Sequence, residues 1–408
     1  MRKIFLKWAA SISAGILFAG CSAMVYDGES MKGGMDGYGE PELSGAVGDD
    51  GGANGGNGNT SAGMLTAGEW RDLDHWQFWS DLMTGEEYSG ESAYWGFYVD
   101  HLVAAHVVRS GGTPAIGVKV VLMRNGQSVW TALTDNQGYA WCYVSPFQSL
   151  KEITEDELTV VVDGTEMTGH PLLSSWRSQS EVKMNEYTLN AETVQPVLSN
   201  VTDIAFVVDA TGSMYDEIKW LKDDMVDILG KASAASAGAI LRTASVFYRD
   251  EGDTYVTRVS DFSNHVKETS SFISKQEADG GGDYPEAVHT ALETALQKLS
   301  WGESSRMRVM FLLLDAPAHH QDDVIASLQN SIQTYAALGI RIVPIAASGA
   351  DKHTEFMLRF FANLTGGTYT FLTDDSGIGG SHIIPSVGEY TVEQLNDLIV
   401  RLIKAFLA

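Results

Sequence analysis

Residues 203–214 read DIAFVVDATGSM, and they carry the clearest structural signal in the C-terminal half of the chain. Its first six residues form a largely apolar run, which is typical of a strand buried on both faces. An oxygen-rich turn follows, in which Asp209, Thr211 and Ser213 alternate with small residues. Residues 214–230 then carry apolar side chains at helical spacing. The stretch therefore predicts a buried strand, a polar loop and an amphipathic helix.

The same alternation of apolar strands and amphipathic helices continues to residue 406. It predicts an α/β fold, a doubly wound and mostly parallel sheet covered by helices on both faces. Further strands are expected at 239–248, 254–259, 307–314, 340–346 and 367–372, and further helices at 284–299, 321–338, 354–364 and 392–406.

Polar side chains follow several of these strands, at the edge of the sheet where such folds bind ligands. Asp315 comes directly after the apolar run 309–314, and Asp283 lies in the segment GGGDYPE at residues 280–286. Carboxylate and hydroxyl oxygens are hard ligands that suit Mg²⁺, with Mn²⁺ and Ca²⁺ as alternatives. We therefore predict a divalent-cation site made by Asp209, Thr211, Ser213, Asp283 and Asp315.

The sequence DATGS at residues 209–213 resembles the Asp-x-Ser/Thr-x-Ser motif of von Willebrand factor A domains, their metal-ion-dependent adhesion site. The resemblance covers residues 202–406 and implies that Asp315 completes the site. The family usually supplies a Thr from the intervening loop, where this chain has Gly282 and Asp283. Two roles stay open for Asp283: it ligates the cation, or it caps the helix that follows.

The resemblance implies a binding protein with no catalytic residues. The cation keeps an open position, and a protein partner fills it with a carboxylate. Two alternatives stay open: an envelope scaffold whose metal site is only structural, and a hydrolase that uses the metal as a Lewis acid.

Residues 65–199 are expected to form an all-β, sandwich-like domain, because short strand patterns alternate with turn signals there. The string TALTDNQGYA at residues 131–140 resembles a signature of carboxypeptidase regulatory-like domains, which implies a structural or adhesive role. The spacing of Trp76 and Trp79 predicts a short helix with both rings on one face.

The sequence at the N-terminus predicts an export signal and a lipid anchor. Residues 1–20 have a basic start, an apolar stretch too short to span a bilayer, and small residues before Cys21. This pattern resembles a bacterial lipoprotein signal and implies that Cys21 carries lipid. Residues 21–64 form a Gly-rich tether. We therefore expect a lipid-anchored protein of the Gram-negative cell envelope, at the outer membrane or cell surface, with residues 200–408 as the von Willebrand factor A domain.

The charge balance excludes one class of partner. Lys and Arg total 27 and Asp and Glu total 53, for a formal net charge of −26. Nucleic-acid binding needs clustered basic residues, so no nucleic-acid partner is expected.

Overall fold

The computed structural model describes residues 63–150, 152–190, 198–235 and 238–408, all of which belong to one compact unit. The predicted signal at residues 1–20, Cys21 and nearly all of the tether lie outside the described residues. In the part of the chain that is described, no helix is both long and apolar enough to cross a membrane.

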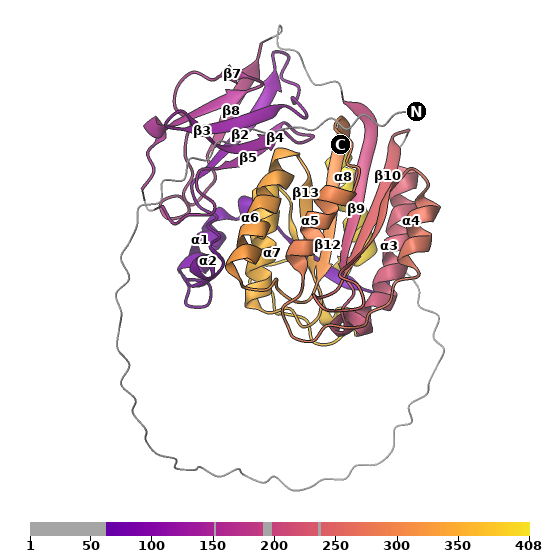
Figure 1. The fold of residues 1–408 in the computed structure, drawn as a ribbon. Helices are drawn as coiled ribbons and strands as arrows, with labels where there is room; N and C mark the ends of the chain where they lie inside the picture. Colours follow the sequence, from indigo (N-terminus) through magenta and orange to yellow (C-terminus); the bar gives the residue numbers. More distant parts are fainter. Residues whose placement is uncertain (1–62, 151, 191–197, 236–237) are drawn as a thin grey trace, which may run out of the picture. The chain divides into compact units, whose positions relative to one another are not determined.

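The central element is an eight-stranded sheet in the order β11-β10-β9-β12-β13-β14-β1-β15 (Figure 1). The five strands from β10 to β14 run parallel, whereas β11, β1 and β15 pair antiparallel with their neighbours. The bounds are β1 Thr66–Trp70, β9 Ser199–Asp209, β10 Ile240–Tyr248, β11 Thr257–Ser263, β12 Ser305–Leu314, β13 Arg341–Ala346, β14 Tyr369–Leu372 and β15 Glu393–Gln394.

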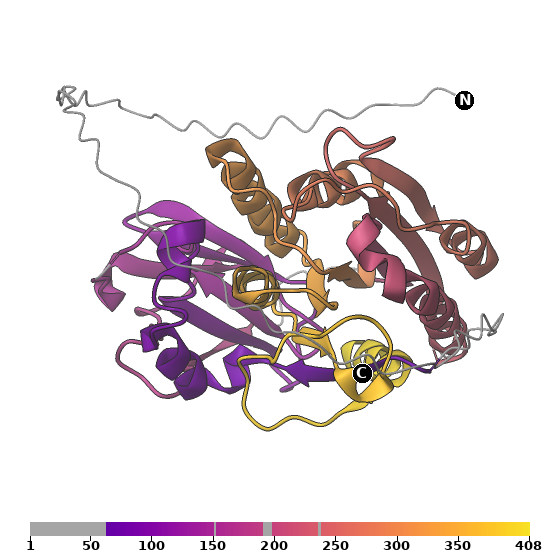
Figure 2. The same cartoon turned by 90° about the horizontal axis from the view of Figure 1, so that it is seen from below.

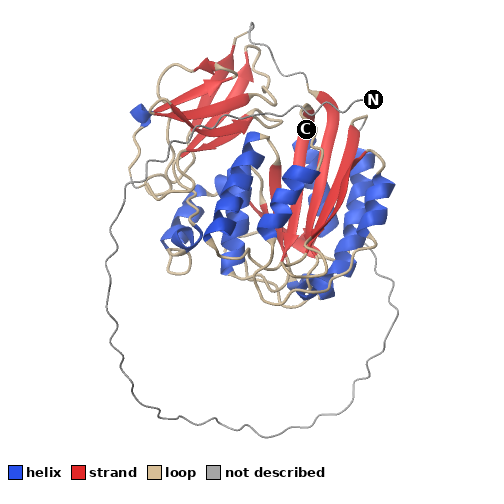
Figure 3. Cartoon of the chain, in the orientation of Figure 1, coloured by secondary structure: helices blue, strands red, loops and turns tan. Residues whose placement is uncertain are grey.

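Helices cover both faces of this sheet, as the sequence predicted (Figure 3). Alternate residues of β9 point to opposite faces: Val207 packs in the core beneath α5, α6 and α7, and Phe206 in the core beneath α3, α4 and α8. The helices are α3 Tyr215–Ala235, α4 Val266–Ile273, α5 Val288–Lys298, α6 Asp322–Ala337, α7 Lys352–Thr365 and α8 Leu395–Leu407. The sequence did not predict α4, which is short and rich in Ser and Thr.

Residues 102–189 form the expected β-rich region, seen beside the central sheet in Figure 2. It has a three-stranded sheet in the order β5-β2-β8 and a four-stranded sheet in the order β4-β3-β6-β7. The bounds are β2 Leu102–Arg109, β3 Lys119–Arg124, β4 Gln127–Leu133, β5 Tyr139–Tyr143, β6 Leu158–Val162, β7 Thr165–Glu166 and β8 Met184–Leu189.

The turn at residues 134–138 joins this region to the α/β domain. Asp135 accepts backbone hydrogen bonds from Gln137 and Tyr139, both at 2.9 Å, and so shapes the turn. It also accepts a bond from Arg341 of β13 at 3.0 Å. This contact joins the turn to the central sheet.

The predicted boundary at residue 65 differs from the structure. Strand β1 belongs to the α/β sheet, where it pairs with β14 on one side and β15 on the other. Two short helices follow, α1 Trp76–Thr84 and α2 Glu91–Trp95. Trp76 and Trp79 are buried on one face of α1, which confirms the helical reading of their spacing.

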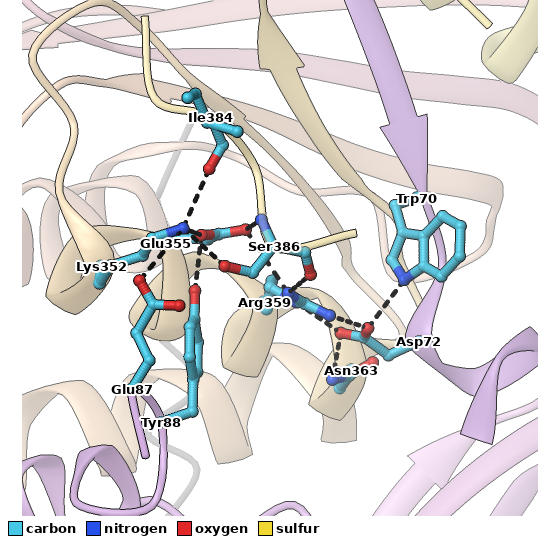
Figure 4. A network of polar contacts seen from close by, with 10 residues as sticks. All are labelled: Trp70, Asp72, Glu87, Tyr88, Lys352, Glu355, Arg359, Asn363, Ile384 and Ser386. Atoms are coloured by element: carbon cyan, nitrogen blue, oxygen red, sulfur yellow. Dashed lines mark hydrogen bonds and ion pairs between the residues drawn. The ribbon is translucent and has the colours of Figure 1, made fainter. Parts of the chain in front are cut away.

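A buried polar network holds this N-terminal segment against α7 (Figure 4). Arg359 is fully buried and donates to both carboxylate oxygens of Asp72, one of them at 3.0 Å. The fully buried Glu355 lies 3.5 Å from Arg359 and accepts hydrogen bonds from Tyr88 at 2.5 Å and Lys352 at 3.1 Å. Helix α7 is therefore bound to the N-terminal segment by polar contacts, and its residues 354–364 are all buried.

Candidate functional site

Three loops meet at the carboxyl edge of the sheet, at the lower end of the domain in Figure 1. Backbone hydrogen bonds tie them together. Gly212 of the first loop donates to Gly280 of the Gly-rich segment at 3.0 Å. Glu286, at the end of that segment, donates from its backbone nitrogen to Pro317 of the loop after β12 at 2.9 Å. The three loops are therefore held together at the carboxyl edge of the sheet, where such folds bind ligands.

The first loop positions three oxygen-bearing side chains. Asp209 is fully buried at the end of β9, and its Oδ1 accepts from the backbone nitrogen of Thr211 at 2.8 Å and from Thr211 Oγ1 at 2.7 Å. The hydroxyls of Thr211 and Ser213 lie 3.1 Å apart. Thr211 is buried, whereas Ser213 is exposed. The loop thus aligns a carboxylate and two hydroxyls from the protein interior toward solvent.

Two further carboxyl groups face this loop. Asp315 is 2% exposed, and the hydroxyl of Ser213 lies close enough to affect its pKa. Glu286 is 3% exposed. One oxygen each of Asp209, Asp315 and Glu286 is buried and accepts no hydrogen bond from any described residue. Three loops thus each contribute a buried carboxyl oxygen without a donor, and a divalent cation would supply the positive charge that such oxygens lack.

The raised pKa values of the three carboxyl groups are consistent with a cation site. Burial raises the pKa of Asp209, and the charge of Asp315 raises it further. Burial is also the largest cause of the raised pKa of Asp315. Burial, together with the charges of Asp209, Asp250 and Asp315, raises the pKa of Glu286 to about 9. These acids repel one another, and a cation between them would relieve the repulsion.

Asp283 is not brought into this group. Its side chain is exposed and makes no hydrogen bond or ion pair with any described residue. It does not cap a helix either, because α5 begins at Val288 with Ala287 as its N-cap. The helix predicted at residues 284–299 therefore starts four residues late. Glu286, from the same segment, is the buried acid. The only feature of the sequence that could have indicated it as a site residue is its position after Pro285, at the end of the Gly-rich segment.

Across the described ranges no three His, Cys, Asp or Glu side chains form a recognisable metal cluster. The candidate site depends instead on two hydroxyls besides its carboxylates. The predicted residues Asp209, Thr211, Ser213 and Asp315 belong to this group, whereas Glu286 takes the place predicted for Asp283.

A buried histidine links the last loop of the domain to this edge. His382 lies between Glu217, in the first turn of α3, and Asp374, with both ring-nitrogen contacts at 2.7 Å. Gly379 of the same loop, at φ +86°, is pressed so close that a Cβ would lie 2.4 Å from a Glu217 oxygen. Burial alone would lower the pKa of His382, but its bonds to Glu217 and Asp374 outweigh this effect and raise it.

We expect His382→Gln to destabilise the fold in a pH-dependent way, by roughly 1–3 kcal/mol at its largest. Because the pKa of His382 is raised in the folded protein, its contacts contribute fully to the free energy of unfolding below pH 6.5, the ordinary pKa of histidine. This contribution is lost as the pH rises through the pKa that His382 has in the folded protein. Urea unfolding of both proteins at pH 5.5 and pH 8.5 measures this. If the difference in free energy of unfolding between wild type and His382→Gln grew as the pH rose, the raised pKa of His382 would be contradicted.

Residues 203–358 match the family model of the von Willebrand factor A domain. The chain therefore contains a von Willebrand factor A domain, as the motif at residues 209–213 predicted. The match includes the first loop, Glu286 and Asp315.

Two curated relatives each match about a third of the chain. An ariadne-like RING finger protein of Acanthamoeba polyphaga mimivirus is 30% identical over 134 residues, which is 33% of this chain and 13% of the relative. The alpha-protein kinase vwkA of Dictyostelium discoideum is 31% identical over 123 residues, which is 30% of this chain and 19% of the relative. This chain thus matches less than a fifth of the length of either relative.

Two solved structures are similar to about half of the chain. BatB from Bacteroides thetaiotaomicron has a TM-score of 0.35 and 10% identity, covering 50% of this chain and 98% of BatB. The pilus adhesin SpaC from Lactobacillus rhamnosus GG has a TM-score of 0.39 and 13% identity, covering 52% of this chain and 30% of SpaC. Likeness at this distance supports no inference about function.

Proposed function

We propose that this protein binds a partner through a divalent cation at the carboxyl edge of its von Willebrand factor A domain. One observation carries the proposal: three loops each contribute a buried carboxylate oxygen that accepts no hydrogen bond from the described residues. Asp209, Asp315 and Glu286, with the hydroxyls of Thr211 and Ser213, would hold the ion. Mg²⁺ is the expected cation, and Mn²⁺ or Ca²⁺ could replace it.

The cation would supply positive charge and an open position for a carboxylate of the partner. This chain's residues do the rest. Thr211 fixes the orientation of Asp209 through two hydrogen bonds. Ser213 presents its oxygen at the exposed end of the loop. The chemistry is recognition rather than catalysis, and Cys21 would tether the protein to the cell envelope.

The test has two stages. Calorimetric titration of the full chain with Mg²⁺ or Mn²⁺ is expected to show saturable binding of one ion. Immobilised peptides with a single Asp should then bind in Mg²⁺, and chelator or replacement of Asp by Asn should abolish that binding. Cation binding without any carboxylate binding would favour the structural scaffold.

Glu286→Gln tests the residue that the sequence did not predict as a ligand. We expect the affinity for Mg²⁺ to fall about tenfold, because one of three carboxylates is lost and its charge is not replaced. The same titration measures the change. An unchanged affinity would show that Glu286 stays protonated beside the ion and is not a ligand.

A further inference from the structure

Tyr248 is the last residue of β10, at the carboxyl edge and directly beside Asp209 of β9. The two residues are paired in register, and β9 and β10 are neighbours in the sheet (Figure 1). The backbone nitrogen of Ala210 donates to the backbone oxygen of Tyr248 at 2.8 Å. Side chains alternate between the two faces of a strand, and residues paired in register point to the same face. Tyr248 therefore shares its face of the sheet with Asp209.

The same face carries the segment that contributes Glu286. Val288, the first residue of α5, packs in the same hydrophobic core as Tyr248, and Glu286 lies two residues before it. Burial raises the pKa of the Tyr248 hydroxyl, and the charges of Asp209, Glu286 and Asp315 raise it further. All three acids of the candidate site are thus close to this one hydroxyl, which comes from a strand that supplies none of them.

The hydroxyl of Tyr248 has no partner among the described residues. The side chain is fully buried, and its oxygen makes no hydrogen bond there. A buried hydroxyl left in this way costs about 1–3 kcal/mol. Oδ2 of Asp209 is also buried and accepts no hydrogen bond from the described residues. An unpaired donor and an unpaired acceptor therefore lie near each other on the inner side of the candidate site.

The two oxygens of Asp209 differ in what holds them. Oδ1 accepts two hydrogen bonds from Thr211, one from its backbone nitrogen and one from its hydroxyl. Oδ2 has no such donor, although Tyr248 lies close enough to affect this carboxyl group. Burial is the largest effect on the pKa of Asp209 and raises it, whereas the hydroxyl of Tyr248 lowers it. The carboxyl group is thus held firmly at one oxygen only.

We propose that Tyr248 is a positioning residue of the cation site, and that its hydroxyl donates to Oδ2 of Asp209 when the cation is bound. A charged carboxylate is a strong acceptor, and each of its oxygens has two lone pairs, so Oδ2 can accept from Tyr248 and still face the cation. Thr211 and Tyr248 then fix the carboxylate from both ends. The proposal rests on the proposed function for the cation and adds a residue from outside the three loops.

Tyr248→Phe tests this role, because it removes the hydroxyl and keeps the ring. We expect calorimetric titration of the full chain to show at least about a tenfold loss of affinity for Mg²⁺, since a hydrogen bond to a charged carboxylate is lost. Without cation, the variant should unfold at an equal or higher urea concentration than wild type, because the hydroxyl it loses is unpaired. A tyrosine that served only in packing would give the opposite pair of results.

The absorption of the phenol gives a second readout that does not depend on the variant. Titration of wild type with Mg²⁺ is expected to change the near-ultraviolet absorption of a tyrosine, because its hydroxyl gains a charged acceptor. The change should saturate together with the calorimetric signal. Tyr248→Phe should bind Mg²⁺ at higher concentrations without this change.

Tyr369→Phe is the matched control. The hydroxyl of Tyr369 is likewise buried and without a partner among the described residues, but Tyr369 is the first residue of β14, away from the carboxyl edge. Its removal should leave the affinity for Mg²⁺ and the absorption change as in wild type.

The possible failures are distinguishable. If Tyr248→Phe bound Mg²⁺ as tightly as wild type, or if wild type bound Mg²⁺ without a change in tyrosine absorption, Tyr248 would not position Asp209, and the cation-dependent function would stand. If wild type bound neither Mg²⁺ nor Mn²⁺ nor Ca²⁺, the positioning role and the proposed function would both be overturned.

Discussion

Asp209→Asn is expected to abolish saturable Mg²⁺ binding, with a loss of affinity of at least about a hundredfold. Asp209 is fully buried at the end of β9, and its Oδ1 orients Thr211, whose hydroxyl neighbours that of Ser213. Its Oδ2 accepts no hydrogen bond from the described residues. The substitution removes the central negative charge and turns one acceptor into a donor. Calorimetric titration of variant and wild type measures the loss.

Asp283→Asn is the control, because it removes the same charge from an exposed residue of the Gly-rich segment. We expect the affinity for Mg²⁺ to change by less than about threefold. Without cation, Asp209→Asn should unfold at an equal or higher urea concentration than wild type, since it relieves repulsion with Asp315. If the Asp209→Asn variant still bound Mg²⁺, Asp209 would not be a ligand of the cation.

Arg359→Met is expected to lower the free energy of unfolding by about 3–5 kcal/mol. Arg359 is the buried cation of the network that joins the N-terminal segment to α7 (Figure 4). Its removal leaves Asp72 and Glu355 buried with less positive charge beside them, and only Lys352 still pairs with Glu355. Urea unfolding followed by tryptophan fluorescence measures the change, since Trp79 lies 5.2 Å from the guanidinium.

Arg401→Met provides the comparison. Arg401 also pairs with two carboxylates, Glu69 and Glu393, but its side chain is 50% exposed. Solvent screens such pairs, so the expected loss is below about 1 kcal/mol. Equal losses for the two variants would mean that the buried network does not hold the N-terminal segment.

The α/β domain could be predicted because its signals are local. The run at residues 203–208 is apolar throughout its last five residues, which few structures other than a buried parallel strand explain. The polar residues after two such strands, Asp209 and Asp315, then had to meet at one edge. Here the residues themselves determine both the strands and the place of the site.

Strand β1 could not be predicted in the same way. It has five residues, and its partners in β14 lie about 300 positions later in the chain. Nothing local distinguishes such a strand from the start of a β-rich domain. Glu286 was missed for a related reason. An acid after Pro285 is typical of a first helical turn, and only the contact with Pro317 shows that the segment is still a loop there.

The position of β1 also determines how the domain bears mechanical load. Because β1 runs antiparallel to β14, its first residue, Thr66, lies at the carboxyl edge. A force applied to the chain ahead of Thr66 and directed along β1 would load its four residue pairs with β14 in shear together, instead of opening them one after another. Such a force would reach the central sheet through β1, which precedes the β-rich region at residues 102–189 in the chain.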